Sequence, residues 1–291
     1  MYSFEKNIQI AQKFLTESEL NEGGWGYYSD SAQAYPEPTC YGLLALKGTP
    51  FIQQKSLDWL SSLINENGQL YLPEDDSPNW GTSHVIITLA RLNKLSEKME
   101  TSIEWLLEWE SQYTESIEED VALNSTLIGW PWISDTFSWV QPTAYAVLAL
   151  KLCGLKTHPR VQEAEKLLFD RMCQGGGWNF GNPVMLDRPV DPSMVETAIT
   201  LLALQDLPND SDEVSSGLEV LESGLSDLPS ALGLSLGILC LTVFNRPTNQ
   251  YVDSLLARQN DDGSWGNSNW WTALAILALK VAGGDEHAFR L

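Results

Sequence analysis

Three carboxylates stand just before apolar segments, where they could act on a bound substrate. Glu37 precedes the run TCYGLLAL, and Asp191 and Glu196 precede the run TAITLLAL. A carboxylic acid in such a place can donate a proton to a substrate as a general acid. A carboxylate before a helix can equally cap the positive end of the helix dipole. The residue types therefore predict a proton donor among these three residues, with helix capping as the structural alternative.

The chain is also rich in tryptophan, with 12 among 291 residues. In the Gly-x-Trp turns at Trp25, Trp178 and Trp265, we expect the indole to fill a gap between neighbouring helices. Aromatic side chains nearer to the start of an apolar segment can instead line a cavity, stabilise positive charge through cation-π attraction, or stack on an apolar or sugar ligand. The candidates for this second role are Tyr35, Trp139 and Trp270.

Three further residues fall in the first turns of the apolar segments. His84 opens one of these segments, and Gln141 and Tyr145 belong to the start of another. We interpret all three as substrate-binding candidates. The structural alternative for His84 is a hydrogen bond to a neighbouring residue at the end of the fold where the apolar segments begin. Together with the carboxylates and aromatics, they predict a pocket for an apolar small molecule.

A repeat positions these residues. An apolar run ending in Ala-Leu or a close variant recurs six times along the chain, each time after a more amphipathic segment and a turn. The small residues near the ends of the six runs are Ala45, Ala90, Ala149, Ala203, Gly237 and Ala278, and the steps between them are 45, 59, 54, 34 and 41 residues. A period in the forties, with two helical patterns in each unit, is typical of stacked helix pairs. No long stretch alternates with period two, so we expect an all-α chain. We predict one domain over residues 1–291, an (α/α)6 toroid of six helical hairpins with the apolar helices inside, and an open solenoid as the competing arrangement.

Charge and composition limit the partners. The chain has 17 Lys and Arg against 39 Asp and Glu, a formal charge of −22, which opposes binding to nucleic acid or to an anionic membrane. No apolar run is long enough for a transmembrane segment. The four cysteines show no CxxC spacing, so we expect reduced, buried thiols in a cytoplasmic protein. The oligomeric state is left open.

A known family shares several of these motifs. The run QNDDGSWG, residues 259–266, resembles the QW motif of squalene-hopene and oxidosqualene cyclases, and residues 23–25 and 176–178 are partial copies. The Pro-Thr-Ala apolar helices resemble the wider prenyltransferase and squalene oxidase repeat group, which includes the protein prenyltransferase β subunits. The resemblance extends over essentially the whole chain and implies an α/α toroid that handles an isoprenoid.

The cyclases open one inner helix with Asp-x-Asp-Asp-Thr-Ala, whose middle Asp protonates an alkene or an epoxide. At the corresponding positions of this chain, Glu37 matches the middle acid and Glu196 matches the last one, while the full acid motif is missing. The resemblance therefore implies an atypical cyclase or isomerase that acts by protonation, with Glu37 or Glu196 as the proton donor and with aromatic residues around the positive charge.

Three alternatives stay open. In the protein prenyltransferases, an Asp, a Cys and a His hold zinc, and the resemblance places Glu37, Cys40 and His84 at similar positions, so a zinc-dependent enzyme of that type is weakly indicated. A carbohydrate-active enzyme on an (α/α)6 barrel would use a carboxyl pair among Glu37, Asp191 and Glu196. A non-catalytic toroid that binds a ligand or a protein would need none of these groups. Apart from the zinc alternative, we expect no cofactor.

Overall fold

The computed structural model describes residues 4–50, 54–72, 76–94, 96–115, 123–226 and 230–291. These residues form twelve α-helices and one short two-stranded sheet, which confirms the predicted all-α class. Six helices alternate along the chain with six others and form an inner ring. The inner helices are α2 (Pro36–Ala45), α4 (Thr82–Arg91), α6 (Val140–Leu152), α8 (Met194–Ala203), α10 (Ala231–Val243) and α12 (Asn269–Gly283).

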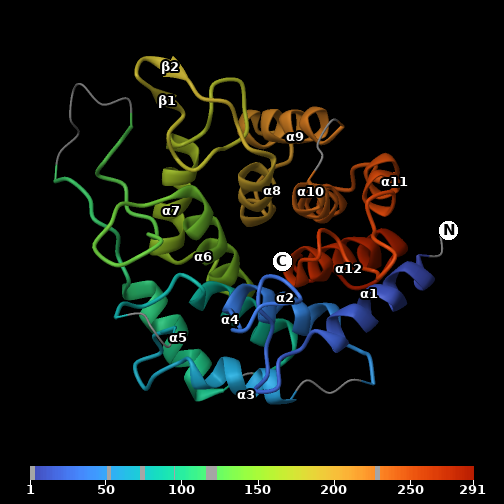
Figure 1. Cartoon of the computed structure of the whole chain (residues 1–291). Helices are drawn as coiled ribbons and strands as arrows, with labels where there is room; N and C mark the ends of the chain where they lie inside the picture. The colour runs from blue at the N-terminus through green and yellow to red at the C-terminus, as the bar shows by residue number, and fades with distance from the viewer. Residues whose placement is uncertain (1–3, 51–53, 73–75, 95, 116–122, 227–229) are drawn as a thin grey trace.

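The inner helices form a closed ring (Figure 1). Each packs against the next in the order α2, α4, α6, α8, α10 and α12, and α12 packs against α2. All ten residues of α2 are buried, as expected of a helix enclosed by other helices. The predicted toroid is therefore present, and the open solenoid is not.

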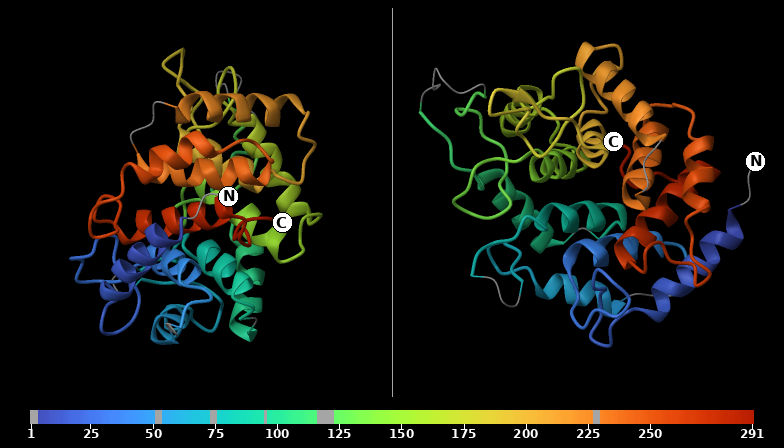
Figure 2. Two further views of the ribbon diagram at one scale, coloured as in Figure 1. Left: turned by 90° about the vertical axis from the view of Figure 1, so that its right-hand side faces the viewer. Right: turned by 45° about the horizontal axis from the view of Figure 1, so that its top comes forward.

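The amphipathic helices wrap this ring. They are α1 (Glu5–Glu17), α3 (Gln54–Ser62), α5 (Glu97–Glu108), α7 (Pro159–Asp170), α9 (Asp212–Leu225) and α11 (Asn249–Leu256). Each outer helix from α3 onward packs on the inner helix that precedes it, and α1 packs on α12 (Figure 2). The first helix thus covers the last one, and the outer layer closes in the same way as the inner ring.

The inner helices all begin at one end of the ring. Tyr28, in the loop before α2, forms a bridge with Ser268, the residue before α12. The loops before α4 and α6 are joined by a bridge between Asn79 and Ile133. Residues in the first turns of different inner helices are therefore neighbours, although they lie far apart in the sequence.

Basic residues join neighbouring helices at the opposite end of the ring. The Lys280 Nζ atom, near the end of α12, donates to the Ala45 carbonyl at the end of α2, at 2.8 Å. Lys151 in α6 makes the same 2.8 Å bond to the Ala203 carbonyl of α8. These bonds satisfy carbonyls that the last turn of a helix leaves without a partner inside the helix.

A tryptophan in four of the turns links an outer helix to the inner helix that follows. The Trp178 indole Nε1–H donates to the Leu168 carbonyl of α7 at 2.6 Å, and the Trp178 backbone N–H donates to the Thr197 hydroxyl of α8 at 2.9 Å. The same two bonds join Trp25 to Leu15 and Thr39, Trp130 to Leu106 and Thr143, and Trp265 to Leu255 and Thr272.

The short sheet was not predicted. Strands β1 (Val184–Met185) and β2 (Arg188–Pro189) pair antiparallel in the loop before α8. Leu186 and Asp187 between them have φ values of 50° and 59°. Two successive residues with positive φ form the tight turn that suits a hairpin. Strands of two residues are too short to show alternation, which explains why the sequence pattern gave no sign of them.

All four cysteines are free thiols, as expected, and Cys40, Cys173 and Cys240 are buried. Across the part of the chain that the structure describes, no helix combines the length and the apolar character that crossing a membrane would require.

Candidate functional site

Five polar side chains from four inner helices meet near the end of the ring at which the inner helices begin. Glu37 and Tyr41 lie one turn apart on α2, His84 lies on α4, Tyr145 on α6 and Glu196 on α8. All five are buried. We call these five residues the polar layer. The parallel direction of the inner helices brings them together, because each residue belongs to the first or second turn of its helix.

Glu37 is enclosed by protein. Its side chain is 4% exposed, and burial raises the pKa of its carboxyl above the usual value. The Tyr27 phenol donates a hydrogen bond to this carboxyl, which opposes the effect of burial without cancelling it. Burial favours the neutral acid because the low-dielectric interior penalises a carboxylate. Glu37 therefore tends to hold its proton at a pH where an exposed glutamate has lost it.

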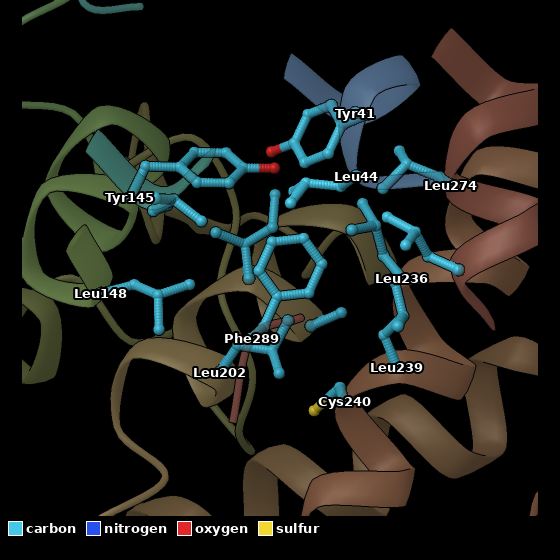
Figure 3. Close-up of a cluster of buried hydrophobic side chains, with 14 of the residues drawn as sticks. Tyr41, Leu44, Tyr145, Leu148, Leu202, Leu236, Leu239, Cys240, Leu274 and Phe289 are labelled. Atoms are coloured by element: carbon cyan, nitrogen blue, oxygen red, sulfur yellow. The ribbon is translucent and has the colours of Figure 1, made fainter. Parts of the chain in front are cut away.

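Tyr41, His84 and Tyr145 form the centre of the polar layer. The Tyr41 hydroxyl and the His84 Nδ1 atom are hydrogen bonded at 2.8 Å, and the rings of His84 and Tyr145 lie 4.1 Å apart between centroids. Burial lowers the pKa of His84 to about 3 and raises the pKa values of both tyrosines. All three rings are therefore neutral at pH 7. Figure 3 shows the two phenol oxygens pointing toward each other.

Glu196 is the second buried carboxyl of the polar layer. It is 3% exposed, and burial raises its pKa, while a hydrogen bond from Ser193 lowers it by a smaller amount. The Oε2 atom has no hydrogen-bond partner among the described residues. Both Glu196 and Glu37 interact electrostatically with Tyr145, so the phenol lies within reach of the two carboxyls.

Buried polar atoms without a hydrogen-bond partner are concentrated on the inner helices. Within the described residues, they belong to His84 (Nε2), Thr88, Tyr145, Glu196, Thr200, Ser235 and Trp270 (Nε1), and to Arg160 on an outer helix. Proteins satisfy nearly all buried polar groups, since an unsatisfied one costs about 1–3 kcal/mol. So many unsatisfied groups on one ring indicate a place where water or the polar groups of a ligand bind.

Half-buried aromatic side chains lie over the polar layer. Trp80 contacts the edge of His84 with centroids 4.6 Å apart, and Trp132 contacts Trp80 at 4.4 Å. On the other side, Tyr27 lies 5.1 Å from Tyr35 and 5.8 Å from Trp270. We call Tyr27, Tyr35, Trp80, Trp132 and Trp270 the aromatic rim. Because these residues are half-buried and the polar layer is fully buried, the rim separates the polar layer from solvent.

The structure gathers six of the nine residues predicted from the sequence: Tyr35, Glu37, His84, Tyr145, Glu196 and Trp270. Gln141 is buried at the start of α6, one turn before Tyr145. Trp139 lines a separate pocket of about 290 Å³, together with Phe137, Leu127 and Arg171. Asp191 is exposed in the loop before α8 and influences the pKa of Cys173, whereas Glu37 and Glu196 are buried.

Four residues of the polar layer and rim were not predicted as site residues. Tyr27 and Trp132 lie at matching positions, each two residues after the tryptophan of a Gly-Trp turn, whereas Trp80 lies in a loop without that match. Tyr41 did leave a signal, since Pro-Thr-Cys-Tyr at residues 38–41 matches Pro-Thr-Ala-Tyr at residues 142–145. The fourth residue of both runs is a tyrosine of the polar layer.

The zinc alternative required Glu37, Cys40 and His84 to converge on one point. In the described residues, no group of three or more His, Cys, Asp or Glu side chains is arranged to hold a metal ion. The Nδ1 atom of His84 is hydrogen bonded to Tyr41, and Cys40 interacts with Thr88. The geometry gives zinc binding by these three residues no support.

No protein family model matches the sequence, and no curated protein is similar to it. Solved structures are similar in fold. The type II terpene cyclase MstE from Scytonema is 14% identical with a TM-score of 0.68, and the match covers 96% of this chain and 97% of that one. A variant of MstE in complex with geranylgeranyl dihydroxybenzoate, its substrate, is 13% identical with a TM-score of 0.60 over 95% and 96% of the two chains.

A structure of a different activity is also similar. An α-amylase from Clostridium perfringens is 14% identical with a TM-score of 0.63, over 94% of this chain and 97% of that one. Identities this low establish a shared fold, and folds of this kind carry several chemistries. The function therefore depends on the side chains of the polar layer and the aromatic rim.

Proposed function

We propose that this protein is an isoprenoid cyclase or isomerase in which Glu37 starts the reaction by donating a proton. The observation that carries the proposal is the state of Glu37, a carboxylic acid that is 4% exposed, has a raised pKa and lies beside the aromatic rim. A neutral acid held in a closed apolar site can protonate a substrate without competition from water.

The raised pKa also indicates which group is protonated. A carboxyl with a raised pKa is a reluctant acid, and an unactivated alkene is a very weak base. An epoxide oxygen has lone pairs and accepts a proton far more readily. The Tyr27 hydrogen bond would stabilise the carboxylate that Glu37 becomes after the transfer. We therefore favour a substrate with a terminal epoxide over one that carries only alkenes.

The rim and the polar layer suit the positive charge that follows ring opening. The faces of Trp80, Trp132 and Trp270 can stabilise a carbocation through cation-π attraction, which is worth about 2 kcal/mol when the site is desolvated. His84 is neutral because burial lowers its pKa to about 3, so it adds no competing positive charge. The Tyr145 hydroxyl, which faces the Tyr41 hydroxyl (Figure 3), places its oxygen next to the same region.

Glu196 could end the reaction. Its Oε2 atom has no hydrogen-bond partner among the described residues, and its carboxyl interacts electrostatically with Tyr145. At a pH above its raised pKa, Glu196 is ionised and can remove a proton from the carbon next to the final cation, which forms the last double bond and leaves Glu196 neutral. The substrate would gain one proton from Glu37 and lose one to Glu196, so the product would be an isomer of the substrate.

The similarity to MstE supports this proposal at the level of fold and size, because the match covers nearly the full length of both chains. A carbohydrate-active enzyme is less well supported. A polysaccharide needs an open groove with accessible carboxyls, whereas Glu37 and Glu196 are 4% and 3% exposed. The third carboxyl of that hypothesis, Asp191, is exposed in the loop before α8.

The test is incubation of the purified protein with polyprenyl epoxides, followed by mass spectrometry for products of unchanged mass and altered retention. We expect Glu37→Gln to lower turnover by at least about a thousandfold and to leave binding within about threefold, since the amide keeps the size of the side chain and loses the proton. Glu196→Gln should change the product distribution more than the rate of substrate loss.

The matched control is Glu66→Gln, which changes an exposed carboxyl of a distant loop and should leave turnover unchanged. Asp191→Asn tests the remaining carboxyl predicted from the sequence, and a loss as large as that of Glu37→Gln would place Asp191 in the site. Absence of any isomeric product from the unaltered protein, with binding intact, would favour the non-catalytic toroid.

A further inference from the structure

The chain beyond α12 turns back into the ring. Gly284 ends the helix with a φ of 102°, and residues 285–291 then cross the end of the ring opposite to the aromatic rim. Figure 1 shows the end of the chain inside the circle of inner helices. We call residues 285–291 the strap.

The strap is attached to three sides of the ring. Arg91 of α4 donates to the carbonyls of Ala288 and Arg290, and Gln205, just beyond α8, donates to the Phe289 carbonyl at 2.8 Å. The His287 Nε2–H donates to the Leu239 carbonyl of α10 at 2.8 Å. These bonds fix the strap across the lumen and determine where its side chains point.

Within the strap, His287 positions Phe289. The Phe289 backbone N–H donates to the His287 Nδ1 atom at 3.0 Å, a bond that requires a neutral imidazole. Burial lowers the pKa of His287 to about 4, with smaller contributions from the positive charges of Arg290 and Arg91, so the ring is neutral at pH 7. The Phe289 ring is held in one orientation as a result.

Phe289 fills the lumen directly below the polar layer. It is 1% exposed, and its ring centroid lies 6.0 Å from that of Tyr41. Figure 3 shows the ring at the centre of a cluster of leucines, with the hydroxyls of Tyr41 and Tyr145 above it. The surrounding leucines come from α2, α6, α8, α10 and α12; they are Leu44, Leu148, Leu202, Leu236, Leu239 and Leu274.

The lower half of the lumen is thus apolar and would accept a hydrocarbon if Phe289 were absent. The inner helices supply its walls, and a single side chain from outside the repeat closes it. We propose that Phe289 is the floor of the ligand site and sets the length of isoprenoid chain that the protein accepts. This inference rests on the proposed function, because it assigns the chain of the substrate to the lumen below Glu37.

The expected effect follows from the size of the side chain. Replacing the benzyl side chain of Phe289 with the methyl group of alanine would free the volume of about one isoprene unit. A chain longer by one unit could then bury its extra carbons against the leucines, which should raise its affinity by at least about tenfold relative to the unaltered protein.

The test measures the binding of geraniol, farnesol, geranylgeraniol and geranylfarnesol, and the quenching of tryptophan fluorescence reports the binding. The variants are Phe289→Trp, Phe289→Leu and Phe289→Ala. We expect the preferred length to increase as the side chain becomes smaller, by about one unit for Phe289→Ala and by less for Phe289→Leu. The control is Phe180→Ala, which removes a phenyl ring that is 56% exposed and should leave the preference unchanged. The same preferred length in all folded variants would overturn the proposal.

Benzene separates this proposal from the proposed function. A dry apolar cavity left by Phe289→Ala, or a smaller one left by Phe289→Leu if the alanine variant does not fold, should bind benzene and gain thermal stability. If the unaltered protein binds no prenyl alcohol, the proposed isoprenoid function fails, and stabilisation by benzene in the variant alone still supports Phe289 as the side chain that fills the lumen. If benzene stabilises neither protein, Phe289 does not close a lumen, and the inference fails whatever the alcohols do.

Discussion

The tryptophans of the turns and the tryptophans of the aromatic rim differ in burial and in hydrogen bonding. Trp25, Trp130, Trp178 and Trp265 are at most 1% exposed, and each indole N–H donates to a carbonyl of an outer helix. Trp270 belongs to the half-buried rim, and its Nε1 atom is buried with no partner among the described residues. Tryptophan has a structural role where it recurs with the repeat, and it is available to a ligand where the repeat does not require it.

The same contrast appears within one helix. Thr197 and Thr200 of α8 are both fully buried. The Thr197 hydroxyl accepts from the Trp178 N–H at 2.9 Å and donates to its carbonyl at 3.2 Å, whereas the Thr200 hydroxyl has no partner in the described part of the chain. A hydroxyl that joins a turn to an inner helix has its hydrogen bonds satisfied within the protein. Some other hydroxyls of the inner helices have no hydrogen-bond partner among the described residues.

The largest effect should separate Trp178→Ala from Trp270→Ala. The first change opens a cavity in the core and removes the indole bond to the Leu168 carbonyl of α7, so we expect a loss of about 3–5 kcal/mol in the free energy of unfolding. The second removes a half-buried side chain and should cost less than about 1 kcal/mol. Urea denaturation measures both. Equal losses would show that the rim is as structural as the turns.

A titration should distinguish the polar layer from the rest of the ring. Because His84 has a folded-state pKa of about 3, the unfolded chain binds more protons between pH 6.5 and pH 3, and this residue destabilises the protein as pH falls through that window. Glu37 and Glu196 act with the opposite sign, since their raised pKa values make the folded state bind more protons above the unfolded value.

His84→Phe removes only the first contribution. Between pH 6.5 and pH 4, we expect this variant to lose about 3 kcal/mol less of its free energy of unfolding than the unaltered protein does. Denaturant curves at both pH values measure it, and the remaining pH dependence of the variant serves as the internal reference. A variant with the same pH dependence as the unaltered protein would mean that His84 is not the neutral, buried group described above.

The two threonines of α8 offer a matched pair of smaller effects. Thr197→Val leaves the Trp178 N–H buried without an acceptor and should cost about 1–3 kcal/mol. Thr200→Val removes a hydroxyl that has no partner among the residues that the structure describes, so its effect on stability should lie near zero or be favourable. Thermal unfolding of both variants measures the difference. A similar loss in both would mean that Thr200 is satisfied by bound water.

The sequence predicted the ring because the repeat fixes the spacing, direction and apolar face of every inner helix. It also predicted that Glu37 and Glu196 lie at the starts of inner helices, and the structure places both in the first turn of such a helix. Asp191 lies three residues before α8, where the path of the loop decides the direction of the side chain, and this loop leaves it exposed.

Trp80 and Phe289, which the sequence did not identify, lie outside the repeat. Trp80 reaches His84 from the loop before α4, and its contact with Trp132 at 4.4 Å depends on how the loops before α4 and α6 pack together. Phe289 follows the last helix and has no counterpart in the other units. Periodicity says nothing about such residues, because tertiary contacts alone determine their positions.

The most selective comparison should come from Trp→Phe changes at both kinds of position. Trp178→Phe leaves the Leu168 carbonyl without its donor and should cost about 1–2 kcal/mol. Trp270→Phe removes an indole N–H that has no acceptor in the described structure, so the melting temperature should stay within about 2 °C.

If an epoxide or hydroxyl oxygen of the ligand pairs with that N–H, the same change should weaken binding by about fivefold, which calorimetry with a prenyl alcohol would detect. Unchanged binding in Trp270→Phe would leave the ring face as the part of Trp270 that meets the ligand, and a marked loss of stability would place Trp270 with the tryptophans of the turns.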